Sequence, residues 1–279
     1  MVEPVIPRAE ATLAKTADRS ILAIKLAAQF WYCVAAAGLL LFGFYILKFY
    51  GGSTLRGDFA AWGKVMPRGM VPGDTTGNAM IAMHLFVAAI ITLGGLLQLI
   101  PNLRTFAPRF HRWNGRLFVA GAVIGSVSGF YLIAVRGTVG SLGSQLGTTF
   151  NGLLILICAF MAVKSARERA FAIHRRWALR LFLLVNGVWF FRVGLFLWLM
   201  IHQKPVGFDP ETFRGPLLVA LAWSQSLVPL ALLELYLRAR DGRSSVARWS
   251  VSALLFIATI GMGVGIVGAF MGLWQPRLG

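Results

Sequence analysis

The amino-acid sequence predicts an all-α polytopic membrane protein with about seven transmembrane helices. The chain of 279 residues is 57% hydrophobic, has a mean hydropathy of +0.71, and carries only 13% charged residues. A soluble domain usually contains about 25% charged residues, so much of the polar surface of such a domain is missing. Long apolar runs alternate with short basic connections, which is typical of repeated bilayer crossing rather than of one buried core.

The net charge of +17 raises the question of nucleic-acid binding, and the placement of the charges argues against it. Most Lys and Arg lie just outside the apolar runs, where they meet anionic lipid headgroups and set the orientation of the helices. No single basic face, zinc-ligand spacing or aromatic-basic recognition element accompanies them. We therefore expect the lipid bilayer as partner, and no nucleic acid.

The N-terminal part of the chain predicts a tail, one helix and a long connection. Residues 1–20 are polar and should form a short disordered or interfacial tail on the cytoplasmic side. The first helix, at about 21–47, is longer than the apolar region of a signal peptide, which runs to about 7–15 residues. The following connection, 48–79, is rich in Gly, Pro and Asp and is long enough to cap a site on its side of the membrane.

The rest of the chain predicts six further helices, at about Met80–Ile100, Arg116–Val135, Gly147–Val163, Trp177–Ile201, Leu217–Tyr236 and Val251–Leu273. The run at 147–163 is short for a span of about 20 residues, so its Gly- and Ser-rich approach should complete the crossing. Residues 21–279 then form one transmembrane domain, with a core at about 80–201. The peripheral helices pack outside this core, at about 21–47, 217–236 and 251–273.

The distribution of basic residues predicts the orientation. Lys and Arg concentrate on the side of the N-terminal tail, in the connections at 104–116, 164–180 and 238–248. The positive-inside rule makes this side cytoplasmic, and an odd number of spans puts the C-terminus outside. We expect a multi-pass protein of the bacterial inner membrane, with a cytoplasmic N-terminus and an external C-terminus.

An internal repeat lies in the predicted core. The run from His111 to Phe118 is similar to the run from His174 to Phe182, because both contain Trp-x-x-Arg-Leu-Phe with His-Arg just upstream. Each copy opens a helix that leaves the cytoplasmic side, so the two helix hairpins should be parallel repeats about an axis along the membrane normal. The repeat predicts a central four-helix bundle.

The two histidines of the repeat have two interpretations. If His111 and His174 face one another across the repeat axis, their imidazoles would ligate a haem iron or another metal near the cytoplasmic interface. Alternatively, the repeat is an interfacial belt that binds anionic lipid headgroups and helix ends. The residues of this belt are Arg112, Trp113, Arg116, Arg175, Arg176, Trp177 and Arg180.

Further polar residues lie near the opposite side or deep in a span. His84 and His202 form a candidate second pair of axial ligands, although a lone intramembrane histidine often bonds to a neighbouring helix. Arg192 lies well inside its predicted helix, where a charge costs at least about 2.5–3.5 kcal/mol. Its counter-charge would be a haem propionate, a lipid phosphate or a substrate carboxylate. The alternative is hydrogen bonding to helix carbonyls and to Asn186.

Glu234 is the one acid in the apolar part of a predicted span. It lies near the cytoplasmic end of its helix, at a depth similar to that of Arg176 and Arg180. We expect a structural ion pair with one of these arginines. The scarcity of such acids argues against a proton-coupled transporter.

Several runs of this sequence resemble a bacterial family of predicted membrane proteins, domain of unknown function 2306. The matching runs are Pro72–Asn78, His84, Gly95–Pro101, Arg104, His111–Arg116, His174–Arg180 and Trp189–Arg192. The resemblance implies a polytopic membrane protein and singles out His84, His111, His174 and Arg192, but it implies no activity or cofactor. A looser analogy links the architecture to four-helix di-haem b-type cytochromes. Those proteins hold their haem ligands within helices, whereas His111 and His174 lie at helix starts.

Three functions fit these observations. The first is a b-type cytochrome-like electron-transfer module that binds haem b through these histidines and exchanges electrons with a quinone or another redox partner. The second is a transporter, or a lipid- or anion-binding protein, that uses Arg192. The third is a non-catalytic membrane subunit whose polar residues join helices. No catalytic motif in a usable context identifies an enzyme.

Overall fold

The structure is a computed structural model that describes residues 8–278 except 67, 138 and 139. The α-helices in this part of the chain are α1 (Arg8–Tyr45), α2 (Gly52–Leu55), α3 (Thr75–Gln98), α4 (Pro101–Phe106), α5 (Pro108–Tyr131), α6 (Leu142–Arg167), α7 (Phe171–Val185), α8 (Gly187–His202), α9 (Pro216–Asp241) and α10 (Ser245–Ala269). Short π-helical turns extend three of them, at Ile46–Gly51, Leu132–Arg136 and Phe270–Trp274. The described residues form no strand beyond an isolated bridge between Asp209 and Arg214.

The predicted fold class is confirmed. Six helices of the described chain are long and apolar enough to cross a bilayer, and α7 with α8 makes a seventh if the bent pair is one span. The predicted short span at 147–163 is part of α6, which has 26 residues. The predicted tail is helical from Arg8, because α1 begins there, and residues 1–7 lie outside the described residues.

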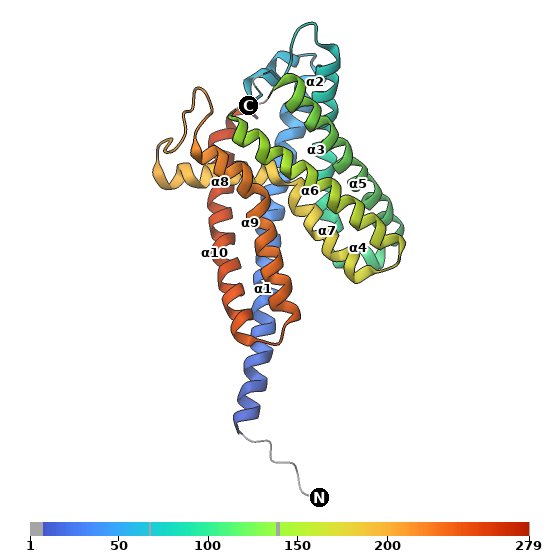
Figure 1. Ribbon diagram of the computed structural model, residues 1–279, viewed down its shortest axis with the longest axis vertical. Helices are drawn as coiled ribbons and strands as arrows, with labels where there is room; N and C mark the ends of the chain where they lie inside the picture. Colours follow the sequence, from blue (N-terminus) through green and yellow to red (C-terminus); the bar gives the residue numbers. More distant parts are fainter. Residues whose placement is uncertain (1–7, 67, 138–139, 279) are drawn as a thin grey trace, which may run out of the picture.

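The helices form two legs that meet at the top and diverge below (Figure 1). The first leg contains α1, α9 and α10, in which α10 packs on α1 and α9. The second leg contains α3, α5, α6 and α7, which pack in that order, and α7 also contacts α3. Since the predicted peripheral helices build a leg of their own, the expected central four-helix bundle is not confirmed.

The predicted continuous helix at 177–201 is wrong. It is divided into α7 and α8, which meet at an angle of 55° on either side of Asn186. The Asn186 side chain donates to the carbonyl of Phe182 over 2.8 Å, and Asn151 of α6 donates to the carbonyl of Leu184 over 3.1 Å. These amides replace helical hydrogen bonds that the break removes, as an interruption inside a membrane requires.

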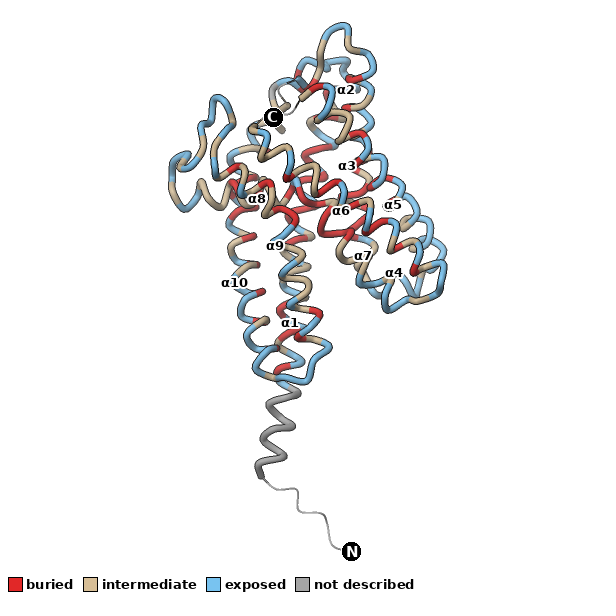
Figure 2. The backbone as a smooth tube through the Cα atoms, in the orientation of Figure 1, coloured by how far each residue is buried: buried red, intermediate tan, exposed pale blue. Residues whose placement is uncertain are grey.

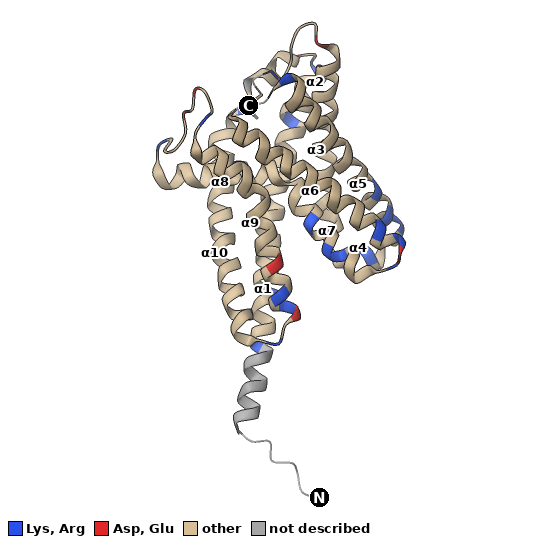
Figure 3. Ribbon diagram, in the orientation of Figure 1, with Lys and Arg blue, Asp and Glu red and all other residues tan. Residues whose placement is uncertain are grey.

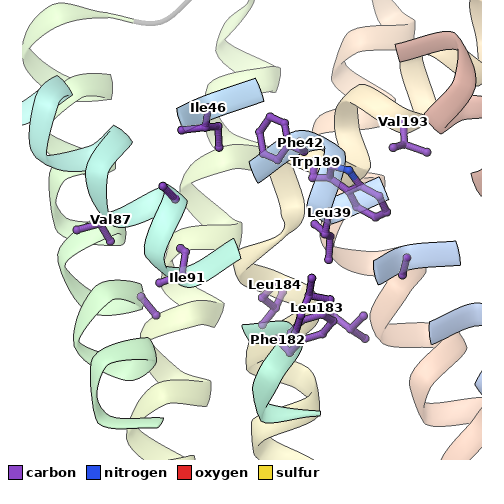
Figure 4. Close-up of a cluster of buried hydrophobic side chains, with 14 of the residues drawn as sticks. Leu39, Phe42, Ile46, Val87, Ile91, Phe182, Leu183, Leu184, Trp189 and Val193 are labelled. Carbon is purple, nitrogen blue, oxygen red and sulfur yellow. The ribbon is translucent and has the colours of Figure 1, made fainter. Parts of the chain in front are cut away.

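Helix α8 runs across the junction of the legs, where it packs on α10 and α9. The buried residues gather around this junction, and exposed residues dominate the outer faces of both legs (Figure 2). Phe42, Trp189 and Leu184 belong to this core (Figure 4). At Gly265 of α10, an added Cβ would overlap the carbonyl of Val193, so glycine permits the close approach of α8.

Lys and Arg concentrate at the lower ends of both legs, as Figure 3 shows. Buried Arg248 binds the hydroxyl of Ser20 and the carbonyl of Gly242 there, which links α10 to α1. Many large apolar side chains are exposed on the helices of both legs, including Leu22 of α1, Ile257 of α10 and Phe160 of α6. Apolar faces above a basic rim are the surface that a bilayer requires.

Candidate ligand-binding site

An apolar cavity of about 270 Å³ lies where the legs separate below α8. This volume is close to the lower end of the range for small-molecule sites, about 300–1,000 Å³. Side chains of α1, α7, α8, α9 and α10 line it, together with Leu99 after α3, and they include Trp31, Phe182, Phe190, Val193, Leu233 and Met262. The cavity therefore joins both legs and α8 rather than lying within one hairpin.

A small number of polar groups interrupt the apolar lining. Ser224, Gln225 and Tyr236 come from α9, and the Gln225 amide donates to the carbonyl of Ala222 over 2.8 Å. Pro229 also lines the cavity and has no N–H, so the carbonyl of Gln225 lacks its usual donor four residues later. The cavity thus offers an apolar interior with a few hydrogen-bonding groups on one helix.

A second cavity, of about 280 Å³, lies directly below along the seam between α7 and α9. Arg175, Arg176 and Arg240 line it together with a single carboxylate, Asp241. Leu179 lines both cavities, so the basic cavity adjoins the apolar one. We call this lower cavity the basic mouth.

Two ion pairs hold α7 against α9 at the basic mouth. Arg176 lies 2.6 Å from Asp241, and Arg180 lies 2.7 Å from Glu234. The predicted pairing of Glu234 with one of these arginines is confirmed. Because Arg240 also contacts Asp241, the carboxylate is shared, while Arg175 has no ion-pair partner within 4 Å in the described chain. The mouth therefore carries an excess of positive charge.

The repeat places the same cation–π pair at the start of α5 and of α7. The guanidinium of Arg116 lies 4.8 Å from the Trp113 ring centroid, and that of Arg180 lies 4.6 Å from the Trp177 centroid. The two copies then differ, because Arg180 pairs with Glu234 and no carboxylate of the described chain pairs with Arg116. Arg112 and Arg116 are exposed, so the first copy faces the surroundings and the second copy faces the first leg.

The structure brings His111 and His174 close enough for their charges to interact. His174 Nδ1 lies 2.9 Å from the carbonyl of Ala162, and the buried Nδ1 of His111 has no hydrogen-bond partner. Neither of the two cavities is lined by a histidine. The described chain also contains no group of three His, Cys, Asp or Glu that could hold a metal.

His84 and His202 are not brought together. His84 lies in α3 with Nδ1 3.0 Å from the hydroxyl of Ser128 in α5, whereas His202 ends α8 and stacks on Trp198 at 4.0 Å. The end of α8 and helix α3 lie on opposite sides of the molecule (Figure 1). His84 and His202 therefore contact separate groups of residues and do not face one another.

Arg192 lies in α8 above the Phe42 ring, 5.2 Å from its centroid. No hydrogen bond or ion pair of its guanidinium occurs among the residues that the structure describes. The expected bond with Asn186 is not among the hydrogen bonds of the described residues, and the Asn186 amide nitrogen donates to the carbonyl of Phe182. Arg192 is outside the linings of both cavities.

Arg136, which no sequence pattern singled out, makes more side-chain hydrogen bonds than any other arginine of the described chain. Its side chain is 5% exposed and lies 2.8 Å from the Asp74 carboxylate. The same guanidinium donates to the carbonyl of Arg68 over 2.9 Å and to the side chain of Asn78. The run Pro72–Asn78 was the available signal, because its Asp and Asn lie four residues apart at the start of a predicted helix.

Six or seven membrane-length helices in the described chain and an apolar exterior define a polytopic integral membrane protein. The model of the predicted membrane protein family DUF2306 matches residues 81–234, more than half of the chain, and the protein belongs to this family. The matched region runs from α3 to Glu234 in α9 and so includes most of the cavity. No curated protein and no solved structure matches the chain.

Proposed function

We propose that this protein binds an anionic amphiphile of the bilayer, with the hydrocarbon chain in the apolar cavity and the charged headgroup at the basic mouth. The observation that carries the proposal is the junction of the two cavities at Leu179. An amphiphile has the same two parts in the same order. Arg175, Arg176 and Arg240 would hold the phosphate or carboxylate, since guanidinium groups bind such anions through paired hydrogen bonds.

Charge should supply most of the selectivity. A hydrocarbon chain gains little by moving from lipid into an apolar cavity, because lipid tails are as apolar as the cavity wall. Each basic residue near an anionic headgroup contributes about 1 kcal/mol. An uncharged quinone would fill the apolar cavity but leave the basic mouth without an anion.

We also propose the orientation that the sequence predicts, in a bacterial inner membrane. The basic lower ends of both legs (Figure 3) would face the cytoplasm under the positive-inside rule. The N-terminus would then be cytoplasmic and, with α7 and α8 as one span, the C-terminus external. The interfacial belt of Arg112, Trp113 and Arg116 would contact anionic headgroups of the cytoplasmic leaflet.

Electron transfer through haem b has less support, and so does transport. The proximity of His111 and His174 favours a haem, whereas neither cavity is lined by these residues or by His84. A Soret band in protein purified after growth with ample haem would establish the cytochrome role in place of ours. Transport would require a route past the core at Phe42 and Trp189.

Filling the apolar cavity tests the proposal. Ala258 of α10 lines the cavity, whereas Ala253 of the same helix is exposed. Native mass spectrometry of protein in a mild detergent should detect a bound anionic lipid in the unchanged protein and in Ala253→Trp. Ala258→Trp should lose the lipid while eluting as the same folded species. Equal lipid retention in all three proteins would contradict the proposal.

Two arginines, one from each copy of the repeat, test where the headgroup binds. Arg175→Gln removes a charge from the basic mouth without breaking an ion pair, and Arg112→Gln removes the corresponding charge of the first copy, which lines neither cavity. We expect Arg175→Gln to weaken lipid retention about five-fold, the effect of about 1 kcal/mol. Arg112→Gln should behave as the unchanged protein. Weaker lipid retention in Arg112→Gln than in Arg175→Gln would place the headgroup on the interfacial belt instead.

A further inference from the structure

Polar atoms without hydrogen-bond partners in the described chain lie around Arg192, where α8 meets α1 and the turn that follows α10. The guanidinium of Arg192 contacts the face of Phe42. Trp274 also packs on Phe42, with its ring centroid 5.5 Å from that of Phe42. Trp189 precedes Arg192 by three residues in α8, so both side chains share one face of that helix. Figure 4 shows Trp189 beside Phe42.

Both tryptophans bury an N–H that bonds to nothing in the described chain. Trp274 is 0% exposed and Trp189 is 1% exposed, and the Nε1 atom of each lacks a hydrogen-bond partner. Buried N–H groups are nearly always paired, with protein, water or a ligand. Two such donors occur in the surroundings of Arg192, whose guanidinium bonds to no acceptor of the described chain.

The charged side chains that interact with Tyr45 and Tyr50 are both arginines. Arg277 lies near enough for its charge, like that of Arg192, to interact with the hydroxyl groups of Tyr45 and Tyr50. The segments that build this region, 20–57, 187–202 and 245–278, contain no Asp or Glu. A guanidinium deep in a membrane protein requires a counter-charge, and these segments supply none.

We propose that Arg192, Trp189 and Trp274 form an oxyanion site, whose ligand is the phosphate of a lipid headgroup or a free phosphate ion. The oxygen atoms would accept hydrogen bonds from the Arg192 guanidinium and from the two indole N–H groups, while Arg277 adds positive charge. The site lies on α8 outside the linings of the apolar cavity and the basic mouth. It is therefore independent of the amphiphile proposed there.

Calorimetric titration of delipidated, detergent-solubilised full-length protein tests the site. The probes are inorganic phosphate and dihexanoyl phosphatidylglycerol. Saturable binding of phosphate identifies a free ion as ligand, and binding of the lipid alone identifies a headgroup. Absence of saturable binding for both probes overturns the proposal.

Variants locate the binding on these residues. Arg192→Gln should weaken binding about ten-fold or more, because a charged hydrogen bond is lost. Exposed Arg56 at the same end of the molecule provides the control Arg56→Gln. Trp274→Phe keeps the ring but removes the N–H, and it should weaken binding several-fold, whereas Trp249→Phe at an exposed position should not.

The tryptophan variants decide the matter if Arg192→Gln does not fold. Trp189→Phe and Trp274→Phe both preserve an aromatic ring in the core, so they should remain folded. Unchanged affinity in both would mean that these indoles bond to water rather than to the ligand, and it would overturn the proposed site. Unchanged affinity in a folded Arg192→Gln protein would do the same.

Discussion

Arg136 Nε donates to Asp74 Oδ2 over 2.8 Å and so joins the end of the α5 span to the N-cap of α3, 62 residues earlier. Asp74 uses its other carboxylate oxygen to accept from the Gly77 N–H over 2.8 Å. The Arg136 guanidinium also holds the carbonyls of Arg68 and Gly69. One buried arginine thereby fixes the end of the connection before α3. The sequence predicts that this connection is long enough to cap a site on its side of the membrane.

Removing this arginine charge should loosen the connection before α3. In Arg136→Gln, the Asp74 carboxylate and the carbonyl of Arg68 lose their donor in a site where Arg136 is 5% exposed. We expect the free energy of unfolding to fall by about 1–3 kcal/mol, the cost of leaving a buried acceptor such as the carbonyl of Arg68 without its donor. Limited proteolysis should cleave residues 56–73 faster, while α9 and α10 stay protected. Unchanged cleavage would show that the ion pair does not hold this segment.

Gly77 should tolerate no side chain. An added Cβ would overlap Asp74 Oδ2 and Arg136 Nε, so Gly77→Ala should break the same ion pair without removing either charge. Gly51→Ala is the control, because its Cβ would meet nothing within 4 Å. Thermal unfolding in detergent should show a lower midpoint for Gly77→Ala alone. Equal midpoints for the two variants would mean that the Asp74–Arg136 pair is dispensable.

The contribution of Asp74 to stability should disappear in acid. The N–H of Gly77 and then the guanidinium of Arg136 hold the pKa of the Asp74 carboxyl below its usual value of 3.8. Because the folded-state pKa is lowered, the stabilisation is complete above pH 3.8 and is lost as the pH falls through the lowered pKa. The difference in unfolding midpoint between the unchanged protein and Asp74→Asn should be constant from pH 7 to about pH 5 and should shrink below pH 3.8. A difference that changes between pH 5 and pH 7 would assign the effect to another group.

The stability of the contact between α7 and α9 should depend on Glu234. The Arg180–Glu234 pair has side chains that are 20% and 37% exposed, whereas the Lys164–Glu168 pair is 53% and 57% exposed at 4.0 Å. Glu234→Gln should lower the free energy of unfolding by about 1 kcal/mol, the upper end for a partly exposed pair. Glu168→Gln should have no measurable effect. Unfolding titrations in mixed detergent micelles measure the free energy of unfolding of both variants. Equal losses in Glu234→Gln and Glu168→Gln would show that the Arg180–Glu234 pair stabilises the protein no more than an exposed pair does.

The spans could be predicted because a bilayer imposes a length and an apolar composition on each helix. The break at Asn186 could not, since the run 177–201 is apolar throughout and the carbonyl of Leu184 finds its donor on Asn151, in another helix. The Glu234 pairing could be predicted because few acids lie in the spans. Hydropathy fixes each helix but says little about which helices pack together.

The candidate site was only partly predictable, because hydropathy does not reveal which helices pack together. Arg136 directly follows the predicted span at 116–135 and could not be recognised from the sequence, because its partner Asp74 lies 62 residues away and pairs only in the folded chain. The repeat singled out Trp177 and Arg180, and the structure places both at the seam between α7 and α9. The apolar cavity arises from the angle between the legs, and no periodicity in the sequence records that angle.

The central claim is that a lipid chain occupies the apolar cavity, and photochemical crosslinking tests it most directly. A phosphatidylglycerol that carries a diazirine near the end of one acyl chain should label Phe190, Leu233 or Met262, which line the cavity. Ala258→Trp should abolish this labelling and Ala253→Trp should not. Labelling that is confined to outward-facing residues such as Ile257 and Val267, and that Ala258→Trp leaves unchanged, would contradict the claim.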